Sequence, residues 1–88
     1  MGIRFLYASS FMRELKRLPA DLQEEAFDAV DSFRDKKNHH RLKVHKLKGA
    51  LARHYAFSVN YRIRIIFRYE GSDIIRFLSI GDHDIYHL

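Results

Sequence analysis

The sequence lacks cysteine and tryptophan and has little proline or glycine, with one Pro and four Gly in 88 residues. Without cysteine the chain can form neither disulfides nor thiolate metal sites, and nothing in it indicates an oxidising compartment. No run reaches the roughly 18–20 apolar residues of a membrane span. The short apolar start, residues 1–7, is unlike a signal peptide. We therefore expect residues 1–88 to form one soluble, cytoplasmic domain.

Charge is unevenly distributed along the chain. Sixteen Lys and Arg against eleven Asp and Glu give a formal net charge of +5. Acidic residues dominate positions 21–35, whereas positions 36–68 contain Lys and Arg but neither Asp nor Glu. A segment of one sign favours a polyanion or an acidic protein as partner. The alternative is a solvated basic surface that keeps a small protein soluble.

The first half of the chain has the pattern of a short strand and two helices. Residues 3–7 read as the strand, and Ser9 or Ser10 is a candidate N-cap for the first helix. Phe11, Leu15 and Leu18 then recur at helical spacing. Pro19 ends this helix or opens the next, because proline has no amide hydrogen. The second helix carries one apolar face: Leu22, Ala26, Ala29, Val30 and Phe33. We predict two antiparallel helices joined at Pro19.

The second half changes to the two-residue period of strands. Alternation indicates strands over residues 41–47, 52–60, 61–69 and 74–80, with a hairpin turn at residues 70–73. The fold class is therefore α+β, in which an N-terminal strand and a two-helix antiparallel hairpin accompany a mainly antiparallel, twisted sheet.

The segment 61–69 places two kinds of side chain on its two faces. Its apolar face is formed by Tyr61, Ile63, Ile65, Phe67 and Tyr69, and the other face carries Arg62, Arg64, Ile66 and Arg68. If the apolar face packs on the helices, the three arginines face solvent. The uncovered face of the sheet would then be a basic floor with arginines near the spacing of phosphates along a nucleic-acid strand.

Histidine and tyrosine near this basic face suggest chemistry on RNA. Cleavage by the ribose 2′-OH needs a base, an acid and cations that hold the phosphate, and it needs no metal. His45 and His83 suit proton transfer, although a non-catalytic role is open for either. Asp82 and Asp84 flank His83 and could orient its ring. Tyr86 is either an aromatic plug or a base-stacking group. We expect no zinc site, because the histidines lack ligand spacing.

The order of these segments resembles the RelE/ParE superfamily of toxins from type II toxin–antitoxin modules. The segment "FMRELKRLPADLQEEAFDAV" is similar to its helical hairpin, and "HKLKGALARHYAFSVNYRIRIIFRYEGSDIIRFLSIGDHDIY" is similar to its sheet. The resemblance covers nearly the whole chain. It implies a four-stranded antiparallel sheet flanked by two N-terminal helices, and a cognate antitoxin that covers the basic surface.

The resemblance also implies functional residues. Arg62 matches the arginine that holds the scissile phosphate, and Arg64 fills the second arginine position. His83, and His45 within "HKLKG", match the histidine-using, YafQ-type branch, and Tyr86 matches its late aromatic residue. Further substrate contacts would come from Lys46, Lys48, Arg53 and Arg68. The pattern departs from that branch at Ser58 and Arg62, where the branch has a histidine and an acidic residue.

Two activities occur in this superfamily. RelE-like members cleave mRNA in the ribosomal A site, and ParE-like members inhibit DNA gyrase. We expect a ribosome-dependent mRNA endoribonuclease that uses no cofactor or metal, with the ribosome, mRNA and an antitoxin as partners, and operator DNA through the antitoxin. A gyrase inhibitor and a non-catalytic antitoxin-binding protein are the alternatives.

Overall fold

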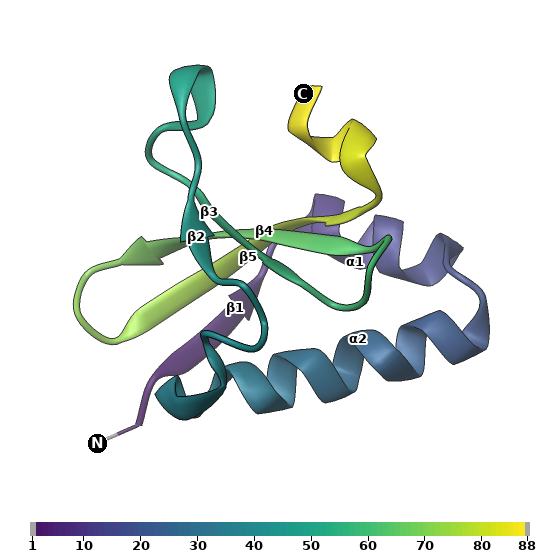
Figure 1. Ribbon diagram of the computed structural model, residues 1–88, viewed down its shortest axis with the longest axis horizontal. Coiled ribbons are helices and arrows are strands. Elements are labelled where there is room, and N and C mark those ends of the chain that lie inside the picture. The colour runs from purple at the N-terminus through teal and green to yellow at the C-terminus, as the bar shows by residue number, and fades with distance from the viewer. Residues whose placement is uncertain (1, 88) are drawn as a thin grey trace.

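A single sheet with a helical hairpin on one face forms the frame of the protein (Figure 1). The computed structural model describes residues 2–87, without the side chains of His83 and His87. Its elements in chain order are β1 (Arg4–Tyr7), α1 (Ser9–Arg17), α2 (Ala20–Phe33), η1 (Lys36–Asn38), β2 (His45–Lys46), η2 (Gly49–Leu51), β3 (Tyr55–Ser58), β4 (Arg64–Glu70), β5 (Ile74–Gly81) and η3 (His83–His87), where η marks 3-10 helices. The α+β expectation is confirmed.

The strands form one mixed sheet in the order β1-β5-β4-β3-β2. β1 pairs in parallel with β5, and the other neighbours are antiparallel. The sheet therefore has five strands, one more than the four that the resemblance implied, because the N-terminal strand joins it. The predicted strand over residues 41–47 is shorter than expected: only His45 and Lys46 pair, since the chain turns through residues 39–43.

The helical hairpin agrees with the sequence pattern. Phe11 and Leu15 of α1 are buried, and so is the predicted face of α2, formed by Ala26, Ala29, Val30 and Phe33. The two helices are separated by Leu18 and Pro19. No helix within residues 2–87 is both long and apolar enough to cross a membrane.

Polar residues of α1 form hydrogen bonds with the part of β5 that β1 does not pair with. The predicted serine N-cap is wrong, because Ala8 is the N-cap residue and Ser10 Oγ instead donates a hydrogen bond to the Leu78 carbonyl at 2.6 Å. One carboxylate oxygen of Glu14 accepts from Ser79 Oγ at 2.8 Å and from the Ile80 amide at 3.2 Å. Two of these bonds pair the Leu78 carbonyl and the Ile80 amide, which β1, ending at Tyr7, does not reach. They fix the end of β5.

Aromatic rings fill the main core between the hairpin and the sheet. Phe33 of α2 stacks on Phe57 of β3, with ring centroids 4.6 Å apart and planes 7° from parallel. Phe67 of β4 and Phe77 of β5 are fully buried beside them. Burying a large apolar side chain contributes roughly 1.5–3 kcal/mol, so these rings supply much of the stability of a small domain.

A bulge in β5 alters which of its residues reach this core. Ile66 pairs with Ser79 but Phe67 pairs with Phe77, so Leu78 is an extra residue on β5. The alternation shifts at this point. Phe77 before the bulge and Ile80 after it consequently both belong to the main core.

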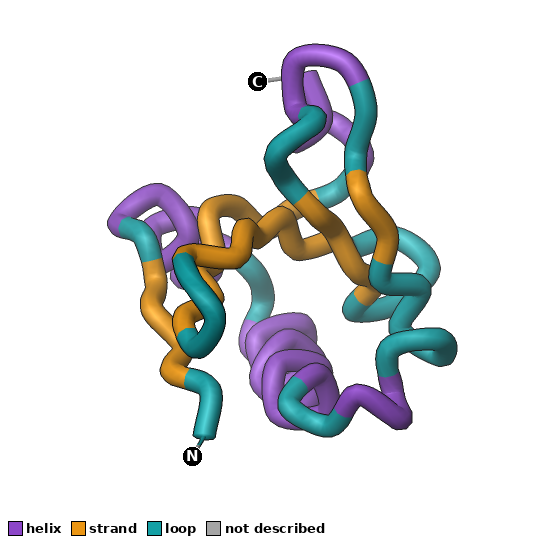
Figure 2. Tube along the Cα trace, turned by 90° about the vertical axis from the view of Figure 1, so that its left-hand side faces the viewer, coloured by secondary structure: helices purple, strands orange, loops and turns teal. Residues whose placement is uncertain are grey.

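The second face of the sheet carries its own apolar cluster. Ala56 and Ile66 lie directly opposite one another on β3 and β4, and Ile85 of η3 packs on them. Partly buried residues Leu47, Leu78 and Tyr86 complete the cluster. Figures 1 and 2 show η3 and the β2–β3 connection on the side of the sheet opposite α2. The expected open basic floor is therefore wrong at its centre, where apolar side chains lie between the arginines.

The predicted strand 61–69 begins later than expected. β4 starts at Arg64, and Tyr61 and Arg62 lie in the bend before it. The side chain of Tyr61 is 88% exposed, so its assignment to the core is wrong. Ile63, Ile65 and Phe67 are buried in the main core as predicted.

Replacing Gly81 by alanine tests how tightly η3 packs on the sheet. A Cβ at Gly81 would lie 2.7 Å from Cγ2 of Ile85, which is itself buried. We expect Gly81→Ala to lower the free energy of unfolding by about 1–3 kcal/mol, measured by chemical denaturation. Gly2→Ala is the control, since nothing lies within 4 Å of a Cβ there. Equal stability of the two variants would contradict this packing.

Candidate active site

One end of the β4–β5 pair carries a surface hollow of about 410 Å3. It is lined by Tyr61, Arg62, Arg64, Asp82 and Asp84. The pairing of Arg64 with Gly81 brings these two segments together, although they lie about 20 positions apart in the chain. His83 begins η3 between the two aspartates, and its side chain lies outside the described part of the structure.

Asn60 organises the arginine side of the hollow. Its side-chain oxygen Oδ1 accepts hydrogen bonds from the Arg62 amide at 2.8 Å and the Ile63 amide at 2.7 Å. Its backbone carbonyl accepts a third bond, at 2.7 Å, from Nη1 of Arg64. Arg64 is half-buried and held in place, whereas Arg62 is exposed. The two guanidinium groups therefore differ: one is preorganised, and the other can move to meet a ligand.

The other side of the hollow is the first turn of η3. Asp82 Oδ1 accepts from the Asp84 amide at 3.0 Å, and the Asp82 carbonyl accepts from the Ile85 amide at 3.2 Å. Ile85 is buried in the second apolar cluster. This anchors the segment that carries His83.

Tyr86 of η3 interacts electrostatically with Arg64 of β4. Burial of its half-buried ring raises the pKa of Tyr86 above its ordinary value, and the positive charge of Arg64 acts in the opposite direction. The phenol is therefore protonated at neutral pH. It can donate a hydrogen bond to a phosphate or stack on a base, but it does not serve as a general base there.

The hollow has mixed charge. The sequence pattern treated Asp82 and Asp84 only as neighbours of His83, but both line the hollow opposite the arginines. Asn60, which fixes Arg64, was missed altogether. The sequence signal that could have identified Asn60 is its position just before the strand, since asparagine favours turns there.

Several predicted residues lie outside the hollow. His45 is exposed on β2 opposite Ala56, two strands from β4, or roughly 10 Å across the sheet. Its Nδ1 lies 2.8 Å from the Lys43 carbonyl oxygen. Lys46 pairs with Tyr55, which packs on the main core, so Lys46 belongs to the α2 side of the sheet. Lys48 and Arg53 are exposed on either side of η2.

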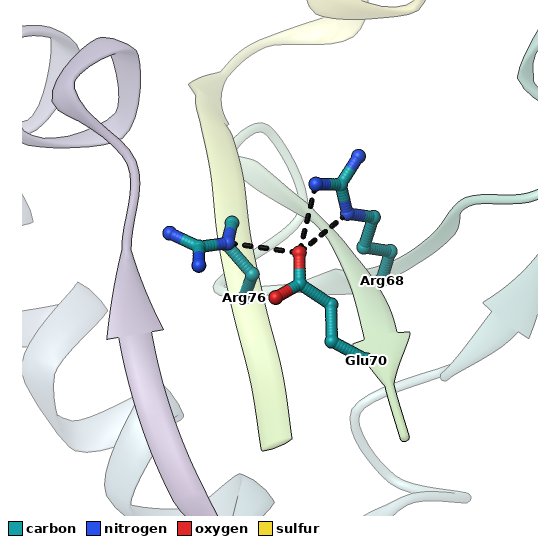
Figure 3. A network of polar contacts seen from close by, with 3 residues as sticks. All are labelled: Arg68, Glu70 and Arg76. Carbon is teal, nitrogen blue, oxygen red and sulfur yellow. Dashed lines mark hydrogen bonds and ion pairs between the residues drawn. The ribbon is translucent and has the colours of Figure 1, made fainter.

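Arg68 lies at the opposite end of β4, where it forms an ion-pair network with Glu70 and Arg76 (Figure 3). Hydrogen bonds from Arg76, and then from Arg68, hold the pKa of Glu70 below its usual range. The ion pairs are therefore present throughout the neutral range. Their contribution to stability is lost only as the pH falls through the lowered pKa.

Within the described residues, no three His, Asp or Glu side chains gather in a way that could hold a metal ion. The hollow instead offers two guanidinium groups and two carboxylates, and the protonated phenol of Tyr86 lies within electrostatic range of Arg64. This set can bind a phosphodiester and orient a proton-transfer group beside it.

Comparison with solved structures identifies the fold. YafQ from E. coli strain BL21(DE3) is 14% identical to this chain and matches with a TM-score of 0.71, covering 96% of this chain and 97% of its own. In the archaeal RelE–RelB complex from Pyrococcus horikoshii OT3, the matching chain is 19% identical over 93% of this chain and 96% of its own, with a TM-score of 0.72.

The YoeB–YefM complex from Staphylococcus aureus contains a chain that is 15% identical, covering 94% and 99% of the two chains with a TM-score of 0.72. No model of a protein family matches this sequence, and no relative was found among curated proteins. The chain therefore has the RelE/ParE-like fold, as its sequence motifs indicate.

Replacing Asn60 by alanine tests the organisation of the hollow. The amides of Arg62 and Ile63 would lose their acceptor, and we expect unfolding to become easier by about 1–3 kcal/mol in chemical denaturation. Asn60→Asp keeps an acceptor oxygen and should lose less. That control is measured at high salt, because the Glu25 carboxylate lies 3.5 Å from Asn60 Nδ2. Identical losses in both variants would refute the acceptor role.

Replacing Arg64 by glutamine tests its electrostatic link to Tyr86. Because the positive charge of Arg64 lowers the pKa of Tyr86, its removal should raise that pKa further. The phenolate absorbance of Arg64→Gln is followed as base is added. Subtracting the curve of Arg64→Gln/Tyr86→Phe leaves the titration of Tyr86, and the parent chain is treated in the same way with Tyr86→Phe. A pKa of Tyr86 that is unchanged or lower than in the parent would argue against the contact.

Proposed function

We propose that this chain is the toxin of a type II toxin–antitoxin module and that it cleaves mRNA on the ribosome. The observation that carries the proposal is the gathering of Arg62, Arg64, Tyr86 and the His83 backbone at one end of the sheet. The fold supports it, since one similar structure is described as a YoeB/ParE toxin from Agrobacterium tumefaciens and others are of YafQ, RelE and YoeB.

Each of these four residues has a role in attack by the ribose 2′-OH. Arg62 binds the scissile phosphate with two parallel hydrogen bonds from its guanidinium group. Its side chain is exposed, and Asn60 bonds only to its backbone amide. Arg64, fixed by the Asn60 carbonyl, stabilises the charge that develops on the phosphoryl oxygens. His83 transfers the proton, with Asp82 or Asp84 orienting its ring. Tyr86 donates a hydrogen bond or stacks on the base beside the cut.

The remaining predicted residues contact the substrate outside the hollow. His45, Lys48 and Arg53 lie on or beside the β2–β3 connection, which stands on the same side of the sheet as η3 (Figure 2), and Lys46 follows His45 on the α2 side. We assign to them contacts with mRNA or the ribosome. These contacts position the mRNA and contribute less to the chemical step than Arg62 and His83 do.

A cognate antitoxin is the second partner. RelE–RelB and YoeB–YefM are complexes, which supports an equivalent partner here. The Lys and Arg residues of the segment 36–68, which contains neither Asp nor Glu, suit an acidic polypeptide that covers the hollow and excludes mRNA.

A gyrase-directed binding protein is the second candidate function. The two carboxylates in the hollow favour it, because they reduce the positive charge available to a phosphate. The distance of His45 from the hollow favours it as well, since one fewer proton-transfer group is then at hand.

The test is expression of the chain without antitoxin, followed by 5′-end mapping of cellular mRNA. We expect growth arrest and reproducible cuts within translated frames. Arg62→Ala and His83→Ala should each lower the cutting rate by roughly 10²–10⁴ and relieve the arrest. Arg17→Ala, which removes an exposed arginine of α1, is the matched control and should stay toxic.

Other results would select the alternatives. Growth arrest with DNA-damage signalling and intact transcripts would indicate the gyrase inhibitor. Absence of arrest in the parent chain would indicate a protein that only binds antitoxin. Cutting that persists in both Arg62→Ala and His83→Ala would refute the assigned roles.

A further inference from the structure

The far end of the β4–β5 pair carries a second cluster of arginines. Arg68 and Arg76 pair directly across the two strands, so their side chains leave the sheet on the same face. Like charges placed opposite one another are unfavourable, and Glu70 offsets this repulsion. Its Oε2 accepts from Nε of Arg68 and from Nε of Arg76, each at 2.8 Å, and lies 2.7 Å from Nη2 of Arg68.

Glu70 leaves part of this cluster free to bind an anion. Only Nε of Arg76 reaches the carboxylate, and no described residue accepts a hydrogen bond from Nη1 or Nη2 of Arg76. Figure 3 shows these terminal nitrogens pointing away from Glu70. The Arg76 and Arg68 side chains are 33% and 46% exposed. The cluster therefore has two cations, one anion and a fork that Glu70 holds in place for a planar or tetrahedral anion.

The cluster lies on the same face of the sheet as the hollow. Arg64, Ile66 and Arg68 alternate along β4, and Ile66 belongs to the second apolar cluster on that face. Four residues of strand separate Arg64 from Arg68 by about 13 Å, which is roughly two nucleotides of an extended strand and up to four of a stacked one. Between the two ends lie Leu78 and Tyr86, which are only partly buried where they pack on the second apolar cluster and offer apolar surface to bases.

We propose that Arg68 and Arg76, held by Glu70, form a second phosphate-binding site for single-stranded RNA, two to four nucleotides from the phosphate bound at Arg62 and Arg64. This proposal rests on the proposed function, which makes RNA the substrate. The apolar surface between the arginine pairs favours RNA over an acidic polypeptide, because unpaired bases stack on such surfaces while carboxylate side chains gain nothing from them. Glu70 sets the affinity by competing with the phosphate for the guanidinium groups.

The experiment measures binding of a fluorescein-labelled single-stranded RNA of 12 nucleotides by fluorescence anisotropy over a range of salt concentrations. We expect Arg68→Gln/Arg76→Gln to weaken binding at least roughly fivefold and to reduce the salt slope by about 1.4, as for two lost contacts to single-stranded phosphates. Arg13→Gln/Arg17→Gln removes the same charge from α1 and should change both quantities much less.

For the Glu70→Gln variant we expect the opposite change in RNA affinity. It removes the competing negative charge while keeping an oxygen acceptor for the arginines, so RNA should bind more tightly. If Glu70 had only a structural role, Glu70→Gln would bind RNA as tightly as the parent chain or more weakly. Thermal unfolding checks that each variant is folded. If the double glutamine variant does not fold, Arg76→Lys replaces it, since lysine keeps the charge but loses the bidentate fork and should still weaken binding.

Three results would overturn the proposal: equal losses in the α1 control and the Arg68/Arg76 variant, no gain in Glu70→Gln, or no saturable RNA binding by the parent chain. A labelled 12-residue polyglutamate whose binding depends on the two arginines, while RNA binding does not, would assign the cluster to an acidic polypeptide instead. The proposed function is tested separately by mapping transcript cuts in cells. If the parent chain did not cut transcripts but its RNA binding still depended on Arg68 and Arg76, the proposed cleavage would fail while the second phosphate-binding site would stand.

Discussion

The pairing of β4 with β5 is the contact on which the rest of this protein depends. Both strands are buried on one face by the helical hairpin, and their centre is covered on the other by η3 and its apolar neighbours. The same pairing places Arg64 beside Gly81 at one end and Arg68 beside Arg76 at the other. Without this register, neither the hollow nor the arginine cluster would exist.

The second apolar cluster explains how so small a chain fixes the segment that follows β5. Ile85 packs on Ala56 and Ile66, and the absence of a side chain at Gly81 leaves room for it. The hydrogen bonds from Ser10 and to Glu14 hold the end of β5 from the other direction. η3 is therefore attached to a strand that is fixed on both sides, which keeps the segment containing His83 next to Arg64.

Charge on this face is balanced rather than uniformly positive. At one end Asp82 and Asp84 accompany Arg62 and Arg64, and at the other Glu70 accompanies Arg68 and Arg76. Glu70 holds Arg68 and Arg76 in defined positions, and all three carboxylates moderate the attraction of the arginines for an anion. If a polyanion binds here as proposed, carboxylates among the arginines would favour ligands whose phosphates fit the arginine positions, which would give selectivity at some cost in affinity.

The amino-acid sequence by itself determined the two helices, the turn at Pro19, the β4–β5 hairpin and the apolar residues of the main core. These features follow from local periodicity and turn chemistry, which neighbouring residues encode. Only the tertiary structure decided where the arginines lie relative to one another. Tyr61 continues the apolar alternation of β4, yet Asn60 turns the chain and exposes it. The bulge at Leu78 and the packing of Ile85 likewise depend on contacts between distant segments, and a one-residue shift in pairing changes the face that every later side chain occupies.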